Sequence, residues 1–234
     1  MRTFVALKFD EELRSALGRT IERQKRAGAD VAKFQFYDPA KTFGPSGSYP
    51  NPEAYRHALT VQFGREDAAQ LKRWCDDDGI EFMASVFDEE RFGWVELLGV
   101  KRHKIASRAV HDEALCRRVL ATGKETFISL GFWERPGVPY EAGNARFLYC
   151  VPKYPCRLSE LCLPASFRDS PYQGFSDHTI GIEAALVAVG RGAVILEKHF
   201  TLDKTLPGPD HVCSATPEEL AALCRYARLM ERVP

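Results

Sequence analysis

Short runs of β-branched and aromatic residues alternate along the chain with longer stretches whose apolar residues recur every three or four positions. The short runs predict strands, and the longer stretches predict amphipathic helices. Eight candidate strands lie at residues 4–9, 31–36, 81–87, 103–107, 126–131, 146–151, 172–178 and 194–200. The clearest helical stretches lie at residues 11–27, 65–78, 88–98, 112–122, 181–189 and 217–231. This alternation predicts a series of βα units.

Eight βα units without a break in composition favour one α/β domain over residues 1–234, of the closed (β/α)8 TIM-barrel type, over an open doubly wound sheet. The fifth and sixth helices are expected to be incomplete. Residues 132–144 contain Pro136 and Pro139, and residues 155–170 have no helical period. The eighth helix has a clear start, because Thr216, Pro217 and Glu219 can form a capping box.

Composition narrows the class of protein. The chain has 234 residues, 45% of them hydrophobic, and its 32 Lys and Arg balance 32 Asp and Glu. This composition excludes disorder, and the zero net charge gives no basic field for nucleic acid or for an anionic membrane. Seven scattered cysteines without a CxxC pair, no long apolar run and an N-terminus that soon turns acidic predict a cytoplasmic protein with reduced thiols.

Polar residues end several candidate strands, and in a barrel the strand ends converge on one mouth. A single His or Lys there is more often a solvated side chain than a ligand, so the joint pattern carries the prediction. Two lysines with nearby serines describe an anion site suited to phosphate or phosphoenolpyruvate. Two histidines on adjacent strand ends predict a divalent-metal site with positions left for water and a substrate carbonyl. The residues are Lys33, Gln35, Lys104, Ser107, Ser129, Ser176, Asp177, His178 and His199, with His211 on a turn that could close over a ligand.

Four segments carry a resemblance to a known family. They are residues 28–35 (GADVAKFQ), 104–107 (KIAS), 174–181 (GFSDHTIG) and 197–203 (EKHFTLD), the last running into 206–211 (LPGPDH). With these segments the sequence resembles the sialic acid synthases, a family that includes legionaminate and pseudaminate synthases. The resemblance extends over almost the whole chain and independently implies the (β/α)8 barrel.

The resemblance also implies a reaction, in which phosphoenolpyruvate condenses with the aldehyde of an N-acylated hexosamine to give a nonulosonic acid and phosphate. It implies that His178 and His199 hold a divalent ion, manganese first and magnesium, cobalt or zinc as alternatives, which polarises the aldehyde. By the same resemblance, the catalytic candidates are Lys104, Tyr154 and Asp177, with Tyr154 beside the sugar and Asp177 orienting its neighbours. The substrate-binding candidates that the resemblance implies are Lys33, Ser107, Ser129 and Ser176. Gln35, Arg108 and His211 are added to them from their places after the predicted strands.

The chain departs from the family pattern at positions that handle protons. Residues 5–10 read VALKFD, without the family's Glu and Asn-rich stretch, and Arg108 and Ala109 replace a glycine and an acidic residue. Alanine cannot transfer a proton, and loss of a general acid or base costs a factor of about 10²–10⁴ in rate. Asp112 and Glu183 are candidate replacements, and Ala109→Glu is expected to raise activity.

Two further departures concern ligand and subunit contacts. Pro152 stands where the family has Asn or Ser. The chain stops after the eighth predicted helix, so we expect the family's C-terminal antifreeze-like domain to be absent and any homo-oligomer to use another interface.

Three functions remain open at this stage. The first is a divergent synthase acting on phosphoenolpyruvate and a sugar aldehyde. The second is a repurposed metal-dependent barrel enzyme for another phosphorylated or keto acid substrate, with Arg108 and Lys8 as ligands. The third is a non-catalytic ligand-binding or regulatory paralogue, which would bind without turnover. The first two predict small-molecule substrates, the third predicts a ligand or a protein partner, and none predicts a nucleic-acid or membrane partner.

Overall fold

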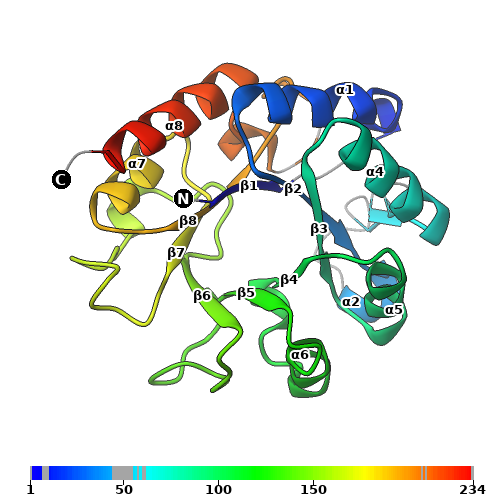
Figure 1. Ribbon diagram of the computed structural model, residues 1–234, viewed down its shortest axis with the longest axis horizontal. Coiled ribbons are helices and arrows are strands. Elements are labelled where there is room, and N and C mark those ends of the chain that lie inside the picture. The colour runs from blue at the N-terminus through cyan, green and yellow to red at the C-terminus, as the bar shows by residue number, and fades with distance from the viewer. Residues whose placement is uncertain are drawn as a thin grey trace.

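The chain folds around parallel strands that close on themselves. Figure 1 shows the computed structural model, which describes residues 2–6, 11–43, 55–56, 58–59, 62–206, 208 and 210–232. The strand order is that of a closed barrel, because β1 pairs with both β2 and β8. The strands are β1 Arg2–Ala6, β2 Val31–Phe36, β3 Glu81–Val86, β4 Arg102–Ile105, β5 Glu125–Ser129, β6 Ala145–Cys150, β7 Gly174–Asp177 and β8 Ile195–His199.

Helices surround the strands over most of the circumference (Figure 1). The α-helices are α1 Glu11–Ala27, α2 Pro39–Phe43, α4 Arg65–Asp77, α5 Glu89–Leu97, α6 Glu113–Leu120, α7 Glu183–Gly190 and α8 Pro217–Met230. Short 3-10 turns are η2 Ser107–Ala109, η3 Leu158–Glu160 and η4 His211–Cys213. The predicted capping box of α8 is confirmed: Thr216 Oγ1 accepts from the Glu219 backbone N–H, and the Glu219 carboxylate accepts from Thr216 N–H.

The outer ring is open on one side. Residues 130–144 and 151–173, all of which the structure describes, contain no α-helix, and Figure 1 shows loops beside β6 and β7. Two tyrosines fasten these loops: Tyr140 OH donates to Val110 O at 2.7 Å, and Tyr149 OH accepts from Cys162 N at 2.8 Å. The α/β class and the parallel strands are therefore confirmed, whereas a helix after every strand, the complete (β/α)8 form, is not.

Most predicted element boundaries agree with the structure to within two residues. The first strand lies at Arg2–Ala6 rather than at 4–9, and residues 7–9 of that prediction lie outside the described residues. The seventh strand starts at Gly174, where a Cβ would lie 2.1 Å from Ile195 O. Only glycine therefore allows β7 to approach β8 this closely at that point.

Side chains alternate between the inside and the outside of the barrel. One buried cluster fills the lower interior and consists of Val31, Met83, Phe127, Leu148 and Ile195. Residues of the opposite parity, such as Phe34, Phe82 and Phe175, belong to two larger clusters that include residues of the outer helices. This period of two fixes which polar residues face the barrel interior.

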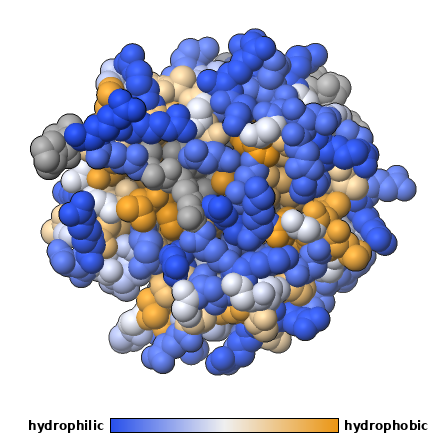
Figure 2. Space-filling view, viewed as in Figure 1, coloured by the Kyte–Doolittle hydropathy of each residue, from blue (hydrophilic) through white to orange (hydrophobic). Residues whose placement is uncertain are grey.

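Figure 2 shows a mostly hydrophilic face on which apolar patches are separated by polar residues. Among the residues that the structure describes, no helix is long and apolar enough to cross a membrane.

Candidate active site

A polar layer lies directly above the apolar layer inside the barrel. By the period of two, seven of the strands each contribute one inward side chain to it, and all seven are buried. They are Lys33, Ser85, Lys104, Ser129, Cys150, Ser176 and Glu197. So many polar groups in a barrel interior indicate a binding site rather than a packed core.

Glu197 is the centre of this layer. Its Oε1 lies 3.0 Å from Lys33 Nζ, and its Oε2 lies 3.5 Å from Lys104 Nζ. Lys104 Nζ also donates to Ser129 Oγ at 2.8 Å, and Ser129 Oγ lies 3.4 Å from Glu197 Oε2. Two ammonium groups from β2 and β4 thus share one carboxylate from β8. The cluster keeps one positive charge in excess, which favours an anionic ligand.

The electrostatics of this cluster follow from burial. Burial lowers the pKa of Lys104 to about 8, although Glu197 opposes the shift. Burial alone would raise the pKa of Glu197, but the Lys104 and Lys33 ammoniums outweigh it and hold that pKa well below its usual range. At neutral pH the carboxylate is therefore ionised, and Lys104 is protonated but close to its titration range.

His178 and His199 lie closer to the mouth of the barrel, each two residues after a member of the polar layer, Ser176 and Glu197. Their ring centroids are 5.5 Å apart, and the Tyr154 ring lies 4.0 Å from His178 and 5.4 Å from His199. Burial lowers the pKa of both histidines, that of His199 to about 3. The structure thus brings the Tyr154 ring and the two histidine rings together, with both imidazoles neutral at pH 7.

These histidines are chemically suited to a divalent ion. His178 Nδ1 lies 2.8 Å from Val151 O, so it carries the proton and leaves Nε2 as the lone-pair donor. His199 Nδ1 is buried with no hydrogen-bond partner among the described residues, and Asp210 Oδ2 lies 3.7 Å away. Neutral imidazoles with an orphaned nitrogen and a neighbouring carboxylate fit an ion of the manganese or zinc type. No group of three or more His, Cys, Asp or Glu in the described parts of the chain is placed to hold a metal.

Asp177 lies on the other side of the barrel wall. Its side chain lies on the same face of β7 as that of Phe175, away from the barrel interior. Asp177 Oδ2 pairs with Lys198 Nζ at 3.0 Å, and both side chains are almost fully buried. Its Oδ1 accepts from Thr179 N and Oγ1, both at 2.8 Å. Asp177 therefore links β7 to β8 directly behind the two histidines, a place suited to orienting them.

The remaining predicted substrate residues lie nearer the rim. Gln35 follows Lys33 on the same face of β2 and is partly exposed. Ser107 Oγ accepts from Phe132 N at 2.7 Å, and the exposed Arg108 follows it in η2. His211 is buried, and its Nδ1 lies 2.8 Å from Thr201 Oγ1 in the segment that follows β8.

The acidic replacements suggested by the sequence have structural roles. Asp112 caps α6 by accepting from Leu115 N at 3.0 Å, and Glu183 accepts from Ile182 N at 2.9 Å at the start of α7. Ala109 is buried in the apolar cluster outside the barrel. A glutamate there would enter that cluster rather than the mouth, so the structure gives no reason for Ala109→Glu to raise activity.

Sequence analysis missed three members of the polar layer. Glu197 lies two residues before His199 on β8, and Ser85 lies two residues after Met83 on β3, so strand parity would have placed both inside. Ser85 Oγ is buried and lacks a hydrogen-bond partner among the described residues. The Cys150 side chain also faces the barrel interior by the alternation along β6, and burial raises the pKa of its thiol to about 12. It is therefore a neutral thiol at pH 7, not a nucleophile.

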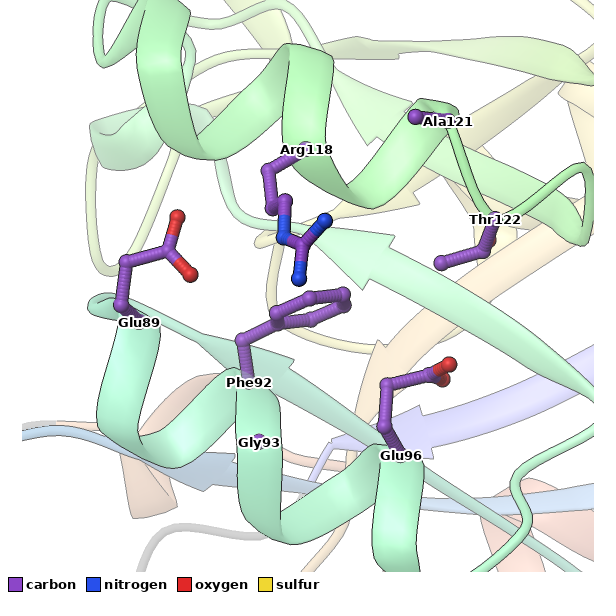
Figure 3. Close-up of a pocket in the computed structure, with 7 residues that line it drawn as sticks. All are labelled: Glu89, Phe92, Gly93, Glu96, Arg118, Ala121 and Thr122. Carbon is purple, nitrogen blue, oxygen red and sulfur yellow. The ribbon is translucent and has the colours of Figure 1, made fainter.

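A separate cavity opens outside the barrel. It has a volume of about 360 Å³ between α5 and α6, and Figure 3 shows Arg118 lying over the Phe92 ring with Glu89 and Glu96 on either side. It includes none of the strand-end residues described above. The polar layer and the two histidines therefore define the candidate active site.

Fold and site together define a class: a parallel-stranded α/β barrel with a buried cluster of two lysines and a glutamate below two neutral histidines. The chain belongs to the NeuB family, whose sequence model matches residues 20–233. It is 34% identical to the N,N'-diacetyllegionaminic acid synthase of Legionella pneumophila, over 89% of this chain and 66% of that protein. It is 31% identical to the human N-acetylneuraminate-9-phosphate synthase, over 92% of this chain and 65% of that protein.

A solved structure is similar over nearly the whole chain. The N-acetylneuraminic acid synthetase of Leptospira borgpetersenii, determined in complex with citrate, superposes with a TM-score of 0.85 at 28% identity, covering 99% of this chain and 84% of that one. The chain spans about two thirds of the length of the two synthases above, 66% and 65%.

Proposed function

We propose that the protein is a phosphoenolpyruvate-dependent synthase that forms a carbon–carbon bond to a sugar aldehyde. The observation that carries this proposal is the buried cluster in which Lys33 and Lys104 share Glu197 beneath two neutral histidines. Synthases of nonulosonic acids among the relatives support the same reaction class. The fold would then be a (β/α)8 TIM barrel in which loops replace the fifth and sixth helices.

In the proposed reaction, C3 of phosphoenolpyruvate attacks the aldehyde carbon of an N-acylated hexosamine. The C–C bond forms, the aldehyde oxygen gains a proton, water adds at C2, and phosphate leaves with cleavage of the C2–O bond. The products are a nonulosonic acid and phosphate. Every oxygen of the leaving phosphate needs a donor, and the polar layer supplies them.

Each part of the site has a role in this scheme. The ammonium groups of Lys33 and Lys104 attract the negative charges of phosphoenolpyruvate, and the Ser107, Ser129 and Ser176 hydroxyls complete its hydrogen bonds. Tyr154 and Gln35 face the sugar from the mouth, and His211 borders it. The neutral histidines His178 and His199 would hold a divalent ion such as manganese, which when bound supplies Lewis-acid polarisation of a carbonyl oxygen.

Calorimetric titration of phosphoenolpyruvate into manganese-loaded protein tests the proposal without knowledge of the sugar. Binding is expected in the micromolar to millimolar range, roughly −8 to −4 kcal/mol. The His178→Ala/His199→Ala variant controls for the metal, and its manganese affinity is expected to be lost. Absence of phosphoenolpyruvate binding to folded wild-type protein would contradict the proposed function.

A further inference from the structure

An aromatic and cationic rim lies at the ends of β4 and β5, and it is formed by Arg108, His111, Phe132, Trp133 and Arg135. The Arg108 guanidinium carbon is 5.6 Å from the Phe132 ring centroid, and that of Arg135 is 5.3 Å from the Trp133 ring. The His111 ring stacks on Trp133 at 5.5 Å, and His111 Nε2 lies 2.8 Å from Phe132 O. These contacts fix the loop after β5 against the turn after β4.

The rim is continuous with the anion site. Phe132 N donates to Ser107 Oγ at 2.7 Å, so the backbone that carries the Phe132 ring also holds a proposed phosphoenolpyruvate ligand. At Gly131, an added Cβ would lie 3.0 Å from Ser107 Oγ and 3.0 Å from Cys150 Sγ. The rim therefore stands at the edge of the polar layer, with Lys104 at the end of the same strand β4 below it.

The exposure of the rim separates it from the polar layer. Lys33 and Lys104 are each 2% exposed, whereas Phe132 is 38% exposed and both arginines are exposed. A small ligand held by the buried lysines leaves the rim to the larger substrate, whose distal part extends toward solvent. The rim is thus placed to recognise the second substrate.

The chemistry of the rim identifies the group it recognises. A guanidinium group binds phosphate or carboxylate through two parallel hydrogen bonds, and stacking on an aromatic ring restrains it before the ligand arrives. We propose that Arg108, held over Phe132, is a specificity-determining residue that binds an anionic group, phosphate or carboxylate, on the sugar aldehyde. This inference rests on the proposed synthase function and names the class of its second substrate.

The experiment measures binding of matched sugars to protein loaded with manganese and phosphoenolpyruvate. The probes are N-acetylmannosamine, its 6-phosphate and a hexuronic acid of the same configuration, offered to wild-type protein, Arg108→Gln and Arg108→Lys. Arg118→Gln is the matched control, because Arg118 also lies over a phenylalanine ring, at 5.9 Å from Phe92, but in the outer cavity. Where the sugars turn over, KM and kcat are measured as well.

Wild-type protein is expected to bind one of the two anionic sugars at least tenfold more tightly than the neutral sugar. Arg108→Gln is expected to abolish that preference by raising KM for the anionic sugar, and Arg108→Lys is expected to keep part of the preference. Arg118→Gln is expected to behave as wild type.

Three results would overturn the inference. The first is that wild-type protein binds neither anionic sugar more tightly than the neutral one. The second is that Arg108→Gln lowers the affinity for the neutral and the anionic sugars equally. The third is that Arg108→Gln lowers the phosphoenolpyruvate affinity tenfold, which would make Arg108 a ligand of the first substrate. In each of these cases phosphoenolpyruvate still binds to wild-type protein. If wild-type protein does not bind it, the proposed function fails first, and this inference falls with it.

Discussion

At the scale of single residues, Lys104 is a buried group of the site whose charge changes just above neutral pH. Its folded-state pKa of about 8 lies below the ordinary value of 10.5 because the ammonium group is buried. Between these values the unfolded chain binds a proton that the folded chain has released, so this group makes stability rise with pH in that window. Anion binding changes in the opposite direction, because the neutral amine attracts phosphate less.

We therefore expect phosphoenolpyruvate affinity to fall as pH rises above about 8, by about tenfold per lost charge-assisted contact. Calorimetric titrations at a series of pH values would measure this, with Lys104→Met as the control. The variant should bind more weakly at every pH and lose the step near pH 8. An identical step in the variant would assign the titration to another group.

At the scale of elements, the alternation of side chains along each strand predicts which residues face the barrel interior, including some that were not singled out from the sequence. Because strand ends converge in a parallel barrel, the sequence predicts Lys33, Lys104 and the two histidines at one end of it; the structure has the lysines buried inside and the histidines nearer the mouth. The same parity places Glu197 inside and Asp177 outside the barrel wall. The contact of Glu197 with lysines from β2 and β4 could not be predicted, because it depends on how strands far apart in sequence come together when the barrel closes.

Turns and loops limited the prediction in another way. Whether position 108 or 109 faces solvent depends on the 3-10 turn η2, which has no hydrophobic period to indicate it. Pro136 and Pro139 did predict the missing helix after β5, and the lack of a helical period over residues 155–170 predicted the missing helix after β6. They gave no indication that Tyr140 and Tyr149 would fasten the loops that replace those helices.

The buried pair between β7 and β8 leads to a prediction at this scale. Asp177→Asn leaves the Lys198 ammonium buried without its counter-charge, so we expect a loss of about 3–5 kcal/mol in the free energy of unfolding. Asp177→Asn/Lys198→Met removes both charges and should recover much of that loss. Urea unfolding measures the stability, and manganese binding followed by electron paramagnetic resonance reports on the histidines.

If the pair orients His178 and His199, manganese affinity should fall about 10–100-fold in Asp177→Asn, as it does when other supports of metal ligands are removed. The double variant should regain stability without regaining full manganese affinity. Unchanged manganese affinity in both variants would show that the pair supports only the fold.

At the scale of the whole molecule, the site joins strands from most of the barrel. Lys33, Lys104, Ser129 and Glu197 come from β2, β4, β5 and β8, so a ligand that contacts all four stabilises the closed barrel rather than one segment of it. Binding to the folded state alone adds about 2.7 kcal/mol at a ligand concentration of 100 Kd. For a chain of 234 residues this corresponds to a rise in Tm of about 5–10 °C.

We therefore expect phosphoenolpyruvate with manganese to raise Tm by this amount, with far-ultraviolet and near-ultraviolet circular dichroism showing the same shift because secondary and tertiary structure unfold together. The control is Lys33→Met/Lys104→Met/Glu197→Gln, which removes the three charges together and leaves none of them buried and unpaired. Its Tm should not respond to phosphoenolpyruvate. An equal shift in this variant would place the ligand elsewhere on the molecule, and a shift in only one spectral region would mean that binding stabilises a part of the barrel rather than its closure.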